Sequence, residues 1–245
     1  MVPSWTETLI SVGLNVVGRT RFCVHPRETV KDIPAVGGTK NWDWQKVQAI
    51  RPDLILLDKE ENPKFISEQS DFAWHASHIQ SIHDMPLELK KLSSRFNNKE
   101  LDDLAQRWQN VVNMPSAKTN AHNIPGLIRW GKTPDYPIDS ILYMIWRKPW
   151  MTVSQKTFIG SMLARVGISI ENFETKYPEI DLENYEEART LLLLSSEPYP
   201  FLNKEKELSN LKFPHAFVDG EAFSWFGVRS LMFLEKHLHQ KTGSS

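Results

Sequence analysis

Cysteine, long apolar runs and an excess of one charge are all scarce in this sequence of 245 residues. Cys23 is the only cysteine, which excludes an internal disulfide. No apolar run approaches the roughly 20 residues of a membrane-spanning helix, and no basic segment followed by an apolar core marks a signal peptide. The formal net charge of -1, with both signs mixed along the chain, favours neither nucleic acid nor an anionic membrane. As written, the sequence predicts a cytoplasmic protein without membrane insertion, or a periplasmic one if a signal has been removed.

The sequence also lacks the common catalytic and nucleotide-binding motifs. There is no Walker loop and no Gly-x-Gly-x-x-Gly run. His75, His78 and His83 have no accompanying cysteines, so their spacing is not specific for zinc. Cys23 lies near His25, but nothing nearby indicates an oxyanion hole. We therefore expect no catalytic residue, no metal site and no intrinsic cofactor, and predict that the protein is not an enzyme.

The apolar pattern predicts alternating helices and strands along most of the chain. Ser4 with Glu7 has the spacing of a capping box, which predicts a helix near the N-terminus. The stretch 116–139 is rich in Pro, Asn, Gly and Lys and reads as irregular. We expect further helices over 42–50, 87–96, 100–112, 154–166, 182–189 and 226–238, and strands over 16–17, 54–57, 140–146, 190–194 and 216–218.

This alternation favours an α/β fold of two lobes with mainly parallel sheets. Leu101, Leu104, Trp108 and Val111 form one apolar stripe, so the helix over 100–112 is expected to be a long linker between the lobes. The predicted organisation is an N-terminal α/β lobe over 1–97, a linker helix over 98–116 and a C-terminal α/β lobe over 117–245.

Polar and aromatic residues follow several of the predicted strands. Ligands of open parallel sheets bind at the carboxyl ends of the strands, where the loops meet. Rings supply buried area and charges fix orientation, so this mixture suits a polar ligand with large flat surfaces. The alternatives are a solvated strand end at Glu60 and Glu61, ordinary rim aromatics at Trp146 and Trp150, and a plain turn at 219–221. The binding candidates from these strand ends are Arg19, Glu60, Glu61, Trp146, Lys148, Glu221, Ser224 and Trp225.

Several motifs resemble one known family, the helical-backbone metal receptors, which include cobalamin- and siderophore-type substrate-binding proteins of ABC transporters. In the first half these motifs are Pro3-Ser4-Trp5-Thr6-Glu7-Thr8-Leu9, Val17-Gly18-Arg19-Thr20, Val36-Gly37-Gly38-Thr39-Lys40 and Arg51-Pro52-Asp53-Leu54-Ile55. In the second half they are Ile145 to Thr152, Ser195 to Phe201, Val218-Asp219-Gly220-Glu221 and Phe223-Ser224-Trp225. The resemblance implies two α/β lobes bridged by one helix, with the ligand in the cleft between them.

The resemblance also implies roles for individual residues. The aromatic residue that packs on the corrin in the cobalamin receptor falls at Tyr177, and a second such aromatic falls at Asp58, which is not aromatic. Acidic residues near the corrin side chains fall at Glu221 and Ser224, so one of the two is retained. The ligand is thus expected to be cobalamin or another metal chelate, such as a siderophore complex or haem.

Docking to the transporter is a further implication of the resemblance. Each lobe of the family carries a surface glutamate that meets the permease. Glu183 occupies the position in the second lobe, whereas Lys64 occupies that of the first, with Glu68 one turn further on. The family also opens with a strand before the Pro-Ser motif, and only Met1 and Val2 stand there. We therefore expect the first strand to be short or missing.

Two functions remain open from the sequence. The first is a monomeric substrate-binding component of an ABC importer, which binds a small metal-chelate ligand in the cleft. The second is a cytoplasmic corrinoid- or metal-handling protein, or an enzyme, on the same fold and without a transporter. In that case Glu60, Glu61 and Glu221 would be acids, bases or metal ligands.

Overall fold

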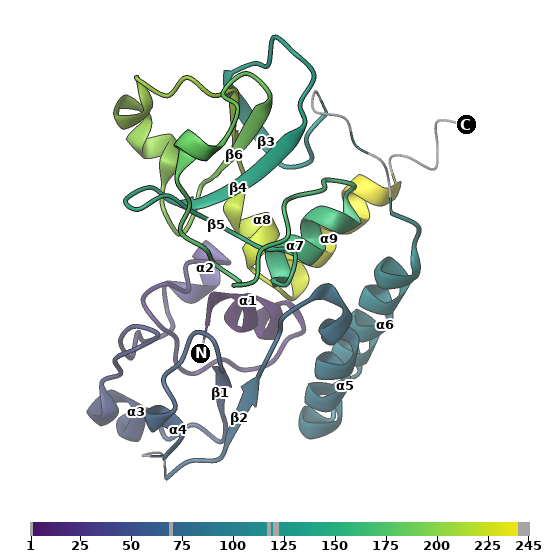
Figure 1. Ribbon diagram of the computed structural model, residues 1–245. Coiled ribbons are helices and arrows are strands. Elements are labelled where there is room, and N and C mark those ends of the chain that lie inside the picture. Colours follow the sequence, from purple (N-terminus) through teal and green to yellow (C-terminus); the bar gives the residue numbers. More distant parts are fainter. Residues whose placement is uncertain (1, 69–70, 117–118, 120–122, 240–245) are drawn as a thin grey trace. The chain divides into compact units, whose positions relative to one another are not determined.

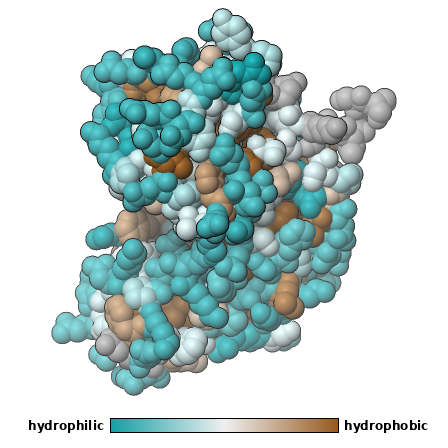
Figure 2. Space-filling view, in the orientation of Figure 1, coloured by the Kyte–Doolittle hydropathy of each residue, from teal (hydrophilic) through white to brown (hydrophobic). Residues whose placement is uncertain are grey.

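A computed structural model describes residues 2–68, 71–116, 119 and 123–239 (Figure 1). The chain divides into two compact units. Unit 1 comprises Met1–Ile79, His83–Asn110 and Trp225–Leu231, and unit 2 comprises Gln80–Ile82, Val111–Ser224 and Met232–Ser245. Figure 2 shows a face that is mostly hydrophilic, with apolar residues in small separate patches. Within the described ranges, no helix has the length and apolarity required to cross a membrane.

Unit 1 is built on a short parallel sheet. Strand β1 (Ile55–Asp58) pairs in parallel with β2 (Trp74–Ser77), and every residue of β1 is buried. The helices that contribute to this unit, entirely or in part, are α1 (Pro3–Ser11), α2 (Arg27–Val30), α3 (Trp44–Ile50), α4 (Phe65–Glu68), η1 (Ile82–Asp84), α5 (Met85–Phe96), α6 (Lys99–Asn113) and α9 (Val228–His239). α3 packs through Val47 in one core cluster with Ile55 and Leu57.

Several predictions for this unit need correction. The helix near the N-terminus is confirmed, but Val2 is its N-cap and Pro3 its first residue, so Ser4 and Glu7 form no capping box. Pro3 suits that position because the first helical N–H has no intrahelical partner. The predicted strand at 16–17 does not form, and the described pairing of that segment is a single parallel bridge between Arg19 and Ala35. No strand precedes α1 among the described residues, as expected.

The helix predicted over 100–112 is confirmed as α6, although the domain limits 98–116 stay a prediction. Its apolar stripe is buried from Leu101 to Val111, and Trp108 Nε1 donates to the carbonyl of Gly227 at 3.2 Å. α6 runs across the division between the two units at Asn110 and Val111. Because the rest of the helix is mostly polar, the stripe and not the overall composition specifies which face is buried.

Unit 2 contains a five-stranded mixed sheet. Its strands are β3 (Leu127–Lys132), β4 (Ser140–Trp146), β5 (Met151–Thr152), β6 (Thr190–Ser195) and β7 (His215–Val218), in the order β3-β7-β6-β4-β5. β4, β6 and β7 are mutually parallel, and the two edge strands are antiparallel to their neighbours. All of β6 is buried, as expected of a central strand covered on both faces.

The remaining elements of unit 2 are helical. They are α7 (Phe158–Arg165), η2 (Leu182–Asn184), η3 (Phe201–Leu208) and α8 (Gly220–Ser224). Two predictions are wrong here, and the alternative of a plain turn at 219–221 is not borne out either. Strand β3 lies inside the stretch read as irregular, the helix expected over 182–189 is only the 3-10 turn η2, and the turn at 219–221 opens helix α8. The helix expected from Ser154 starts later, because the Thr157 side chain accepts the N–H of Gly160 and caps it there.

Candidate ligand-binding site

The carboxyl ends of β1 and β2 in unit 1 meet at a buried polar network. Asp58 is 3% exposed and ends β1. Its carboxylate accepts hydrogen bonds from Ser77 Oγ at 2.8 Å and from the backbone N–H groups of Glu60 at 3.0 Å and Glu61 at 3.3 Å. Trp5 Nε1 donates to Ser77 Oγ at 2.8 Å. Burial raises the pKa of Asp58, although these hydrogen bonds oppose the shift. As placed, Asp58 organises the loop that follows β1.

Glu60 and Glu61 are the exposed members of this strand end. Glu60 Oε1 lies 3.7 Å from His78 Nε2. The carboxyl of Glu61 is partly buried, which raises its pKa, and the nearby charge of Asp58 raises this pKa further. The turn is closed by Asn62, whose Oδ1 accepts the N–H of Asp58 at 2.9 Å. The two glutamates are therefore the acidic groups that a ligand of this strand end would meet.

Arg19 is committed to the protein's own backbone. Its Nε donates to the carbonyls of Val30 at 2.7 Å and Ile33 at 3.0 Å, and its Nη1 lies 3.3 Å from those of Thr20 and Cys23. These bonds hold the loop from Thr20 to Ile33 against the end of the segment that carries Arg19. A binding role for Arg19 stays a prediction.

Trp225 lies in unit 1 and is 8% exposed. The His25 ring contacts it edge-on at 5.5 Å between centroids, and the Arg229 guanidinium lies 5.2 Å from its ring centre. Arg229 in turn forms a bidentate ion pair with Glu7 at 2.8 and 2.7 Å. The ring is thus enclosed by its neighbours, and the predicted contact with ligand stays untested.

Aromatic and cationic side chains gather at the carboxyl end of β4 in unit 2. Trp146 is 41% exposed and packs edge-on against Tyr199, with ring centroids 5.4 Å apart. The Arg147 guanidinium lies 5.7 Å from the ring of Trp150, which stacks on Phe201. Lys148 is exposed, and its carbonyl accepts the Trp146 indole N–H at 3.2 Å. We call Trp146, Arg147, Lys148, Trp150 and Tyr199 the aromatic group.

The aromatic group borders an open depression. It has a volume of about 490 Å³ and is lined by residues 147–150 together with Ile180 and Asp181. Arg147 Nη2 donates to the carbonyl of Glu207 at 2.7 Å, and Tyr199 Oη donates to Glu207 Oε2 at 3.1 Å. Arg147 and Tyr199 were not predicted as site residues. The sequence does contain a signal for both: Arg147 directly follows Trp146, and Tyr199 lies in the segment that starts at Ser195, at the end of a predicted strand.

A hydroxyl and carboxylate network occupies the carboxyl ends of β6 and β7. Ser195 Oγ lies 3.0 Å from Tyr143 Oη, and burial raises the pKa of Tyr143 well above its ordinary value. Ser224 Oγ donates to Glu197 Oε1 at 2.9 Å. A Cβ at Gly220 would lie 2.4 Å from Ser195 Oγ, so only glycine allows α8 to start this close to β6. The predicted residue Ser224 is therefore part of this network, and Glu221 lies in the first turn of α8.

Tyr177 lies beside the edge of the same sheet and is 42% exposed. The backbone around it is fixed by two bonds, from Thr152 N–H to the Pro178 carbonyl and from Ser154 N–H to the Lys176 carbonyl. Its ring is exposed, and its contact with a ligand stays a prediction.

The two predicted docking glutamates are both on the surface. Glu68 ends α4 and pairs with Lys64 at 2.9 Å, and Glu183 lies in η2, where its N–H donates to Asp181. Their docking role stays a prediction. Among the described residues, no group of three or more His, Cys, Asp or Glu side chains is arranged to hold a metal ion.

The fold that carries these residues is similar to that of several solved structures. Neither a protein-family model nor a curated protein matches the sequence. Among solved structures, the periplasmic vitamin B12 binding protein BtuF of Vibrio cholerae is 16% identical, with 100% of this chain and 96% of that chain covered and a TM-score of 0.65. The periplasmic heme-binding protein RhuT from Roseiflexus sp. RS-1 is 15% identical, with 96% and 93% covered and a TM-score of 0.69. The chain has the fold of these binding proteins.

The fold is thus the expected two-lobed α/β fold, although the unit 2 sheet is mixed. A third example is IsdE of S. aureus complexed with heme, which is 16% identical over 99% of this chain and 95% of that chain, with a TM-score of 0.65. BtuF and RhuT are thus named as binding proteins, for vitamin B12 and for heme, and the third structure contains heme.

Proposed function

We propose that this protein is the substrate-binding component of an ABC importer and that its ligand is a flat metal chelate, such as a corrinoid, a haem or a ferric siderophore. Support comes from the fold, which it has in common with vitamin B12 and heme binding proteins. It also comes from the distribution of chemistry, because each unit has polar or aromatic candidates at the carboxyl ends of its parallel strands, such as Glu60 in unit 1 and Trp146 in unit 2.

The aromatic group is the observation that carries this proposal. A half-exposed tryptophan next to a lysine and an arginine offers a ring for stacking and cations for the carboxylates or phosphate of a chelate. A core aromatic would be covered instead, as Trp5 and Trp108 are at 0% exposure. The open depression beside residues 147–150 gives a large planar ligand room to approach.

Titration of the purified chain with cyanocobalamin, haemin and a ferric siderophore tests the proposal. Binding is followed by calorimetry and by quenching of tryptophan fluorescence. Trp146→Ala is expected to weaken binding by about 1 to 3 kcal/mol, the loss of one stacked aromatic. Trp74→Ala is the matched control, because Trp74 is 46% exposed but begins β2 at the amino end of the unit 1 sheet.

The control variant should bind like the unaltered chain. No heat of binding with any of the three compounds would contradict the proposal, and so would an equal loss of affinity in the two variants.

A further inference from the structure

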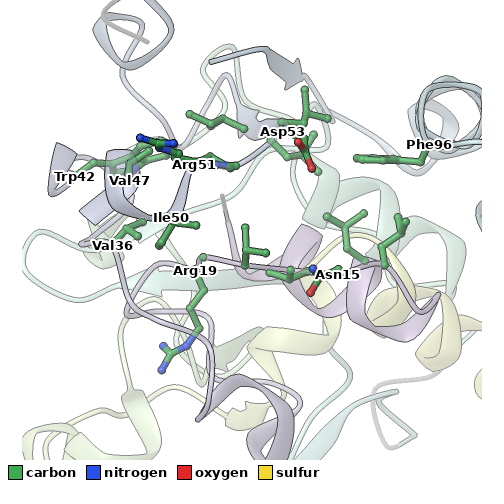
Figure 3. A pocket seen from close by; sticks show the side chains of 18 residues that line it. Asn15, Arg19, Val36, Trp42, Val47, Ile50, Arg51, Asp53 and Phe96 are labelled. Atoms are coloured by element: carbon green, nitrogen blue, oxygen red, sulfur yellow. The ribbon is translucent and has the colours of Figure 1, made fainter. Parts of the chain in front are cut away.

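A cavity of about 300 Å³ lies within unit 1, apart from the strand ends described above. Residues 14–19 line one part of its wall and residues 53–56 another, with apolar side chains from α1, α3 and α5 completing it. Figure 3 shows Ile50 and Phe96 on two sides of the cavity, and the Arg19 side chain pointing away from it. The wall therefore combines apolar side chains with two stretches of backbone.

One of these stretches is the outer edge of β1. Ile55 N–H donates to the Ala73 carbonyl and Lys59 N–H to the Ser77 carbonyl, so the odd-numbered residues bond toward β2. Strand geometry then directs the N–H and C=O groups of Leu54 and Leu56 to the opposite edge, where both residues line the cavity. Within the described part of the chain, β1 has β2 as its only neighbouring strand.

The second stretch ends at Arg19. Arg19 N–H donates to the Pro34 carbonyl at 3.1 Å, and Val36 N–H donates to the Arg19 carbonyl at 2.8 Å. Both backbone groups of Arg19 therefore bond toward residues 34–36. The backbone groups of the adjoining Gly18 accordingly point to the other side, and Gly18 is part of the cavity wall.

The two stretches run in the same direction. Beyond Arg19, Cys23 Sγ lies 3.2 Å from Thr20 Oγ1 and 3.0 Å from Thr6 Oγ1. At the end of β2, which is parallel to β1, Ser77 accepts the Trp5 indole N–H. Both stretches thus end near the first turn of α1, and a strand placed between them would be parallel to both.

We propose that the cavity accepts an extended apolar peptide segment, which adds as a parallel strand between Gly18 and Leu56. Backbone N–H and C=O groups spaced two residues apart match the backbone of a peptide, whereas a hydrocarbon chain would bury them unpaired. Trp42 Nε1, in the same wall, is buried and has no hydrogen-bond partner among the described residues. A peptide carbonyl would supply the missing acceptor.

The occupant should be apolar on both faces. Ile55 and Leu57 pack in one cluster with Val47 of α3, so Leu54 and Leu56 point to the opposite face of β1. Side chains from α3 and from α1 and α5 all contribute to the cavity wall. A strand covered on both faces is a continuous apolar run without proline. About four residues of valine or isoleucine meet these requirements.

The test uses a capped peptide of about four alternating valines and isoleucines with lysines at both ends. Its control has the same side chains but N-methylated amides, which cannot donate hydrogen bonds. Binding to the full chain is measured by calorimetry, and amide hydrogen exchange is measured at Leu56 and Gly18. We expect the unmodified peptide to bind at least about tenfold more tightly and to slow exchange at both amides.

A protein variant provides an independent check. Ile50→Trp places a larger side chain next to Gly18, because Ile50 Cδ1 lies 3.3 Å from the Cβ position of residue 18. It should abolish peptide binding, while Ile128→Trp on exposed β3 should leave it unchanged. If Ile50→Trp does not fold, the two peptides alone decide. Equal binding of both peptides, or unchanged exchange at Leu56 and Gly18, overturns the proposal. Protection that appears without peptide as protein concentration rises also overturns it, since the occupant is then a second copy of the chain.

Discussion

The two units of this protein build their cores in different ways. Among the residues that the structure describes, unit 2 has five paired strands, and its central strand β6 is buried along its full length. Unit 1 has two paired strands in its described ranges, with a cavity along the edge of β1 that does not face β2. Unit 1 is also held by contacts between elements far apart in sequence, such as the Glu7–Arg229 ion pair and the bond from Trp108 to Gly227.

This difference predicts that the two units respond differently to the same kind of damage. A close-packed core loses both transfer free energy and packing when a side chain is truncated. A side chain beside a cavity already has fewer neighbours to lose. Unit 1 should therefore open at lower free energy, and its core residues should be individually less costly to truncate.

The largest expected loss of stability is that of Leu192→Ala, and Leu56→Ala is its counterpart in unit 1. Leu192 is 0% exposed in the centre of the unit 2 sheet, and Leu56 is 2% exposed but lines the cavity. We expect Leu192→Ala to lower the free energy of unfolding by about 4 kcal/mol and Leu56→Ala by about 2 kcal/mol. Urea unfolding followed by amide hydrogen exchange in each unit gives both values.

The two substitutions remove the same atoms, so each is the control for the other. Equal losses in the two units would show that the cavity in unit 1 does not reduce the packing around Leu56, and the comparison would fail.

The same contrast explains which parts of the fold the sequence predicts. β4, β6 and β7 consist of apolar runs, because central strands are buried on both faces. β2 contains Trp74, His75 and Ser77, and its partial exposure leaves no such run to recognise. The pair Val16 and Val17 looks like a strand, but it forms no ladder because β1 does not pair with it. Pairing partners decide such short segments, and a local pattern does not contain them.

The sequence also predicts the candidate site only in part. The segments after β4 and β6 follow from the rule on strand ends, and Trp146 and Lys148 are exposed there. Asp58 also lies at such an end, and Arg19 follows the segment that was predicted as a strand, but the polar groups of both bond within the protein. Whether a charged residue at a strand end faces solvent or stabilises its own loop depends on tertiary partners such as Ser77, which no sequence pattern near residue 58 reveals.

Trp225 in unit 1 and Tyr177 in unit 2 are two aromatic residues predicted to contact the ligand, and they differ in burial. Ser224 bonds within unit 2, whereas its neighbour Trp225 packs in unit 1 between His25 and Arg229. We expect Trp225→Ala to lower the free energy of unfolding by about 3 kcal/mol because it empties a nearly enclosed position. Tyr177→Ala, at an exposed ring, should change it by less than about 0.5 kcal/mol. Thermal and urea unfolding of both variants give the answer.

A second measurement separates packing from ligand contact in these two variants. Tyr177→Ala should weaken chelate binding by about 1 to 3 kcal/mol if its ring stacks on the ligand. A stable Trp225→Ala protein with impaired binding would instead assign Trp225 to the ligand and contradict its role in the core.

The last comparison concerns the polar residues that end β1 and β6. Ser195 in unit 2 is a neutral hydroxyl, bonded to Tyr143, whereas Asp58 in unit 1 is a carboxyl with a pKa raised by burial. Asp58→Ala leaves the N–H groups of Glu60 and Glu61 without their acceptor and should cost about 2 kcal/mol. Asp58→Asn keeps an acceptor and removes the charge, so it should cost less.

The pH dependence follows from the sign of the Asp58 shift. A carboxyl whose pKa is higher in the folded state binds its proton more tightly there, so its contribution to stability is least favourable above the folded pKa. That contribution improves as the pH falls through the folded pKa toward the ordinary value of 3.8. Asp58→Asn has no such group, so its stability relative to the unaltered chain should be greatest near neutral pH and should decline in acid. Urea unfolding of both proteins between pH 7 and about pH 4 measures this difference. A relative stability that stays constant over this range would mean that hydrogen bonds from Ser77, Glu60 and Glu61 cancel the effect of burial on Asp58.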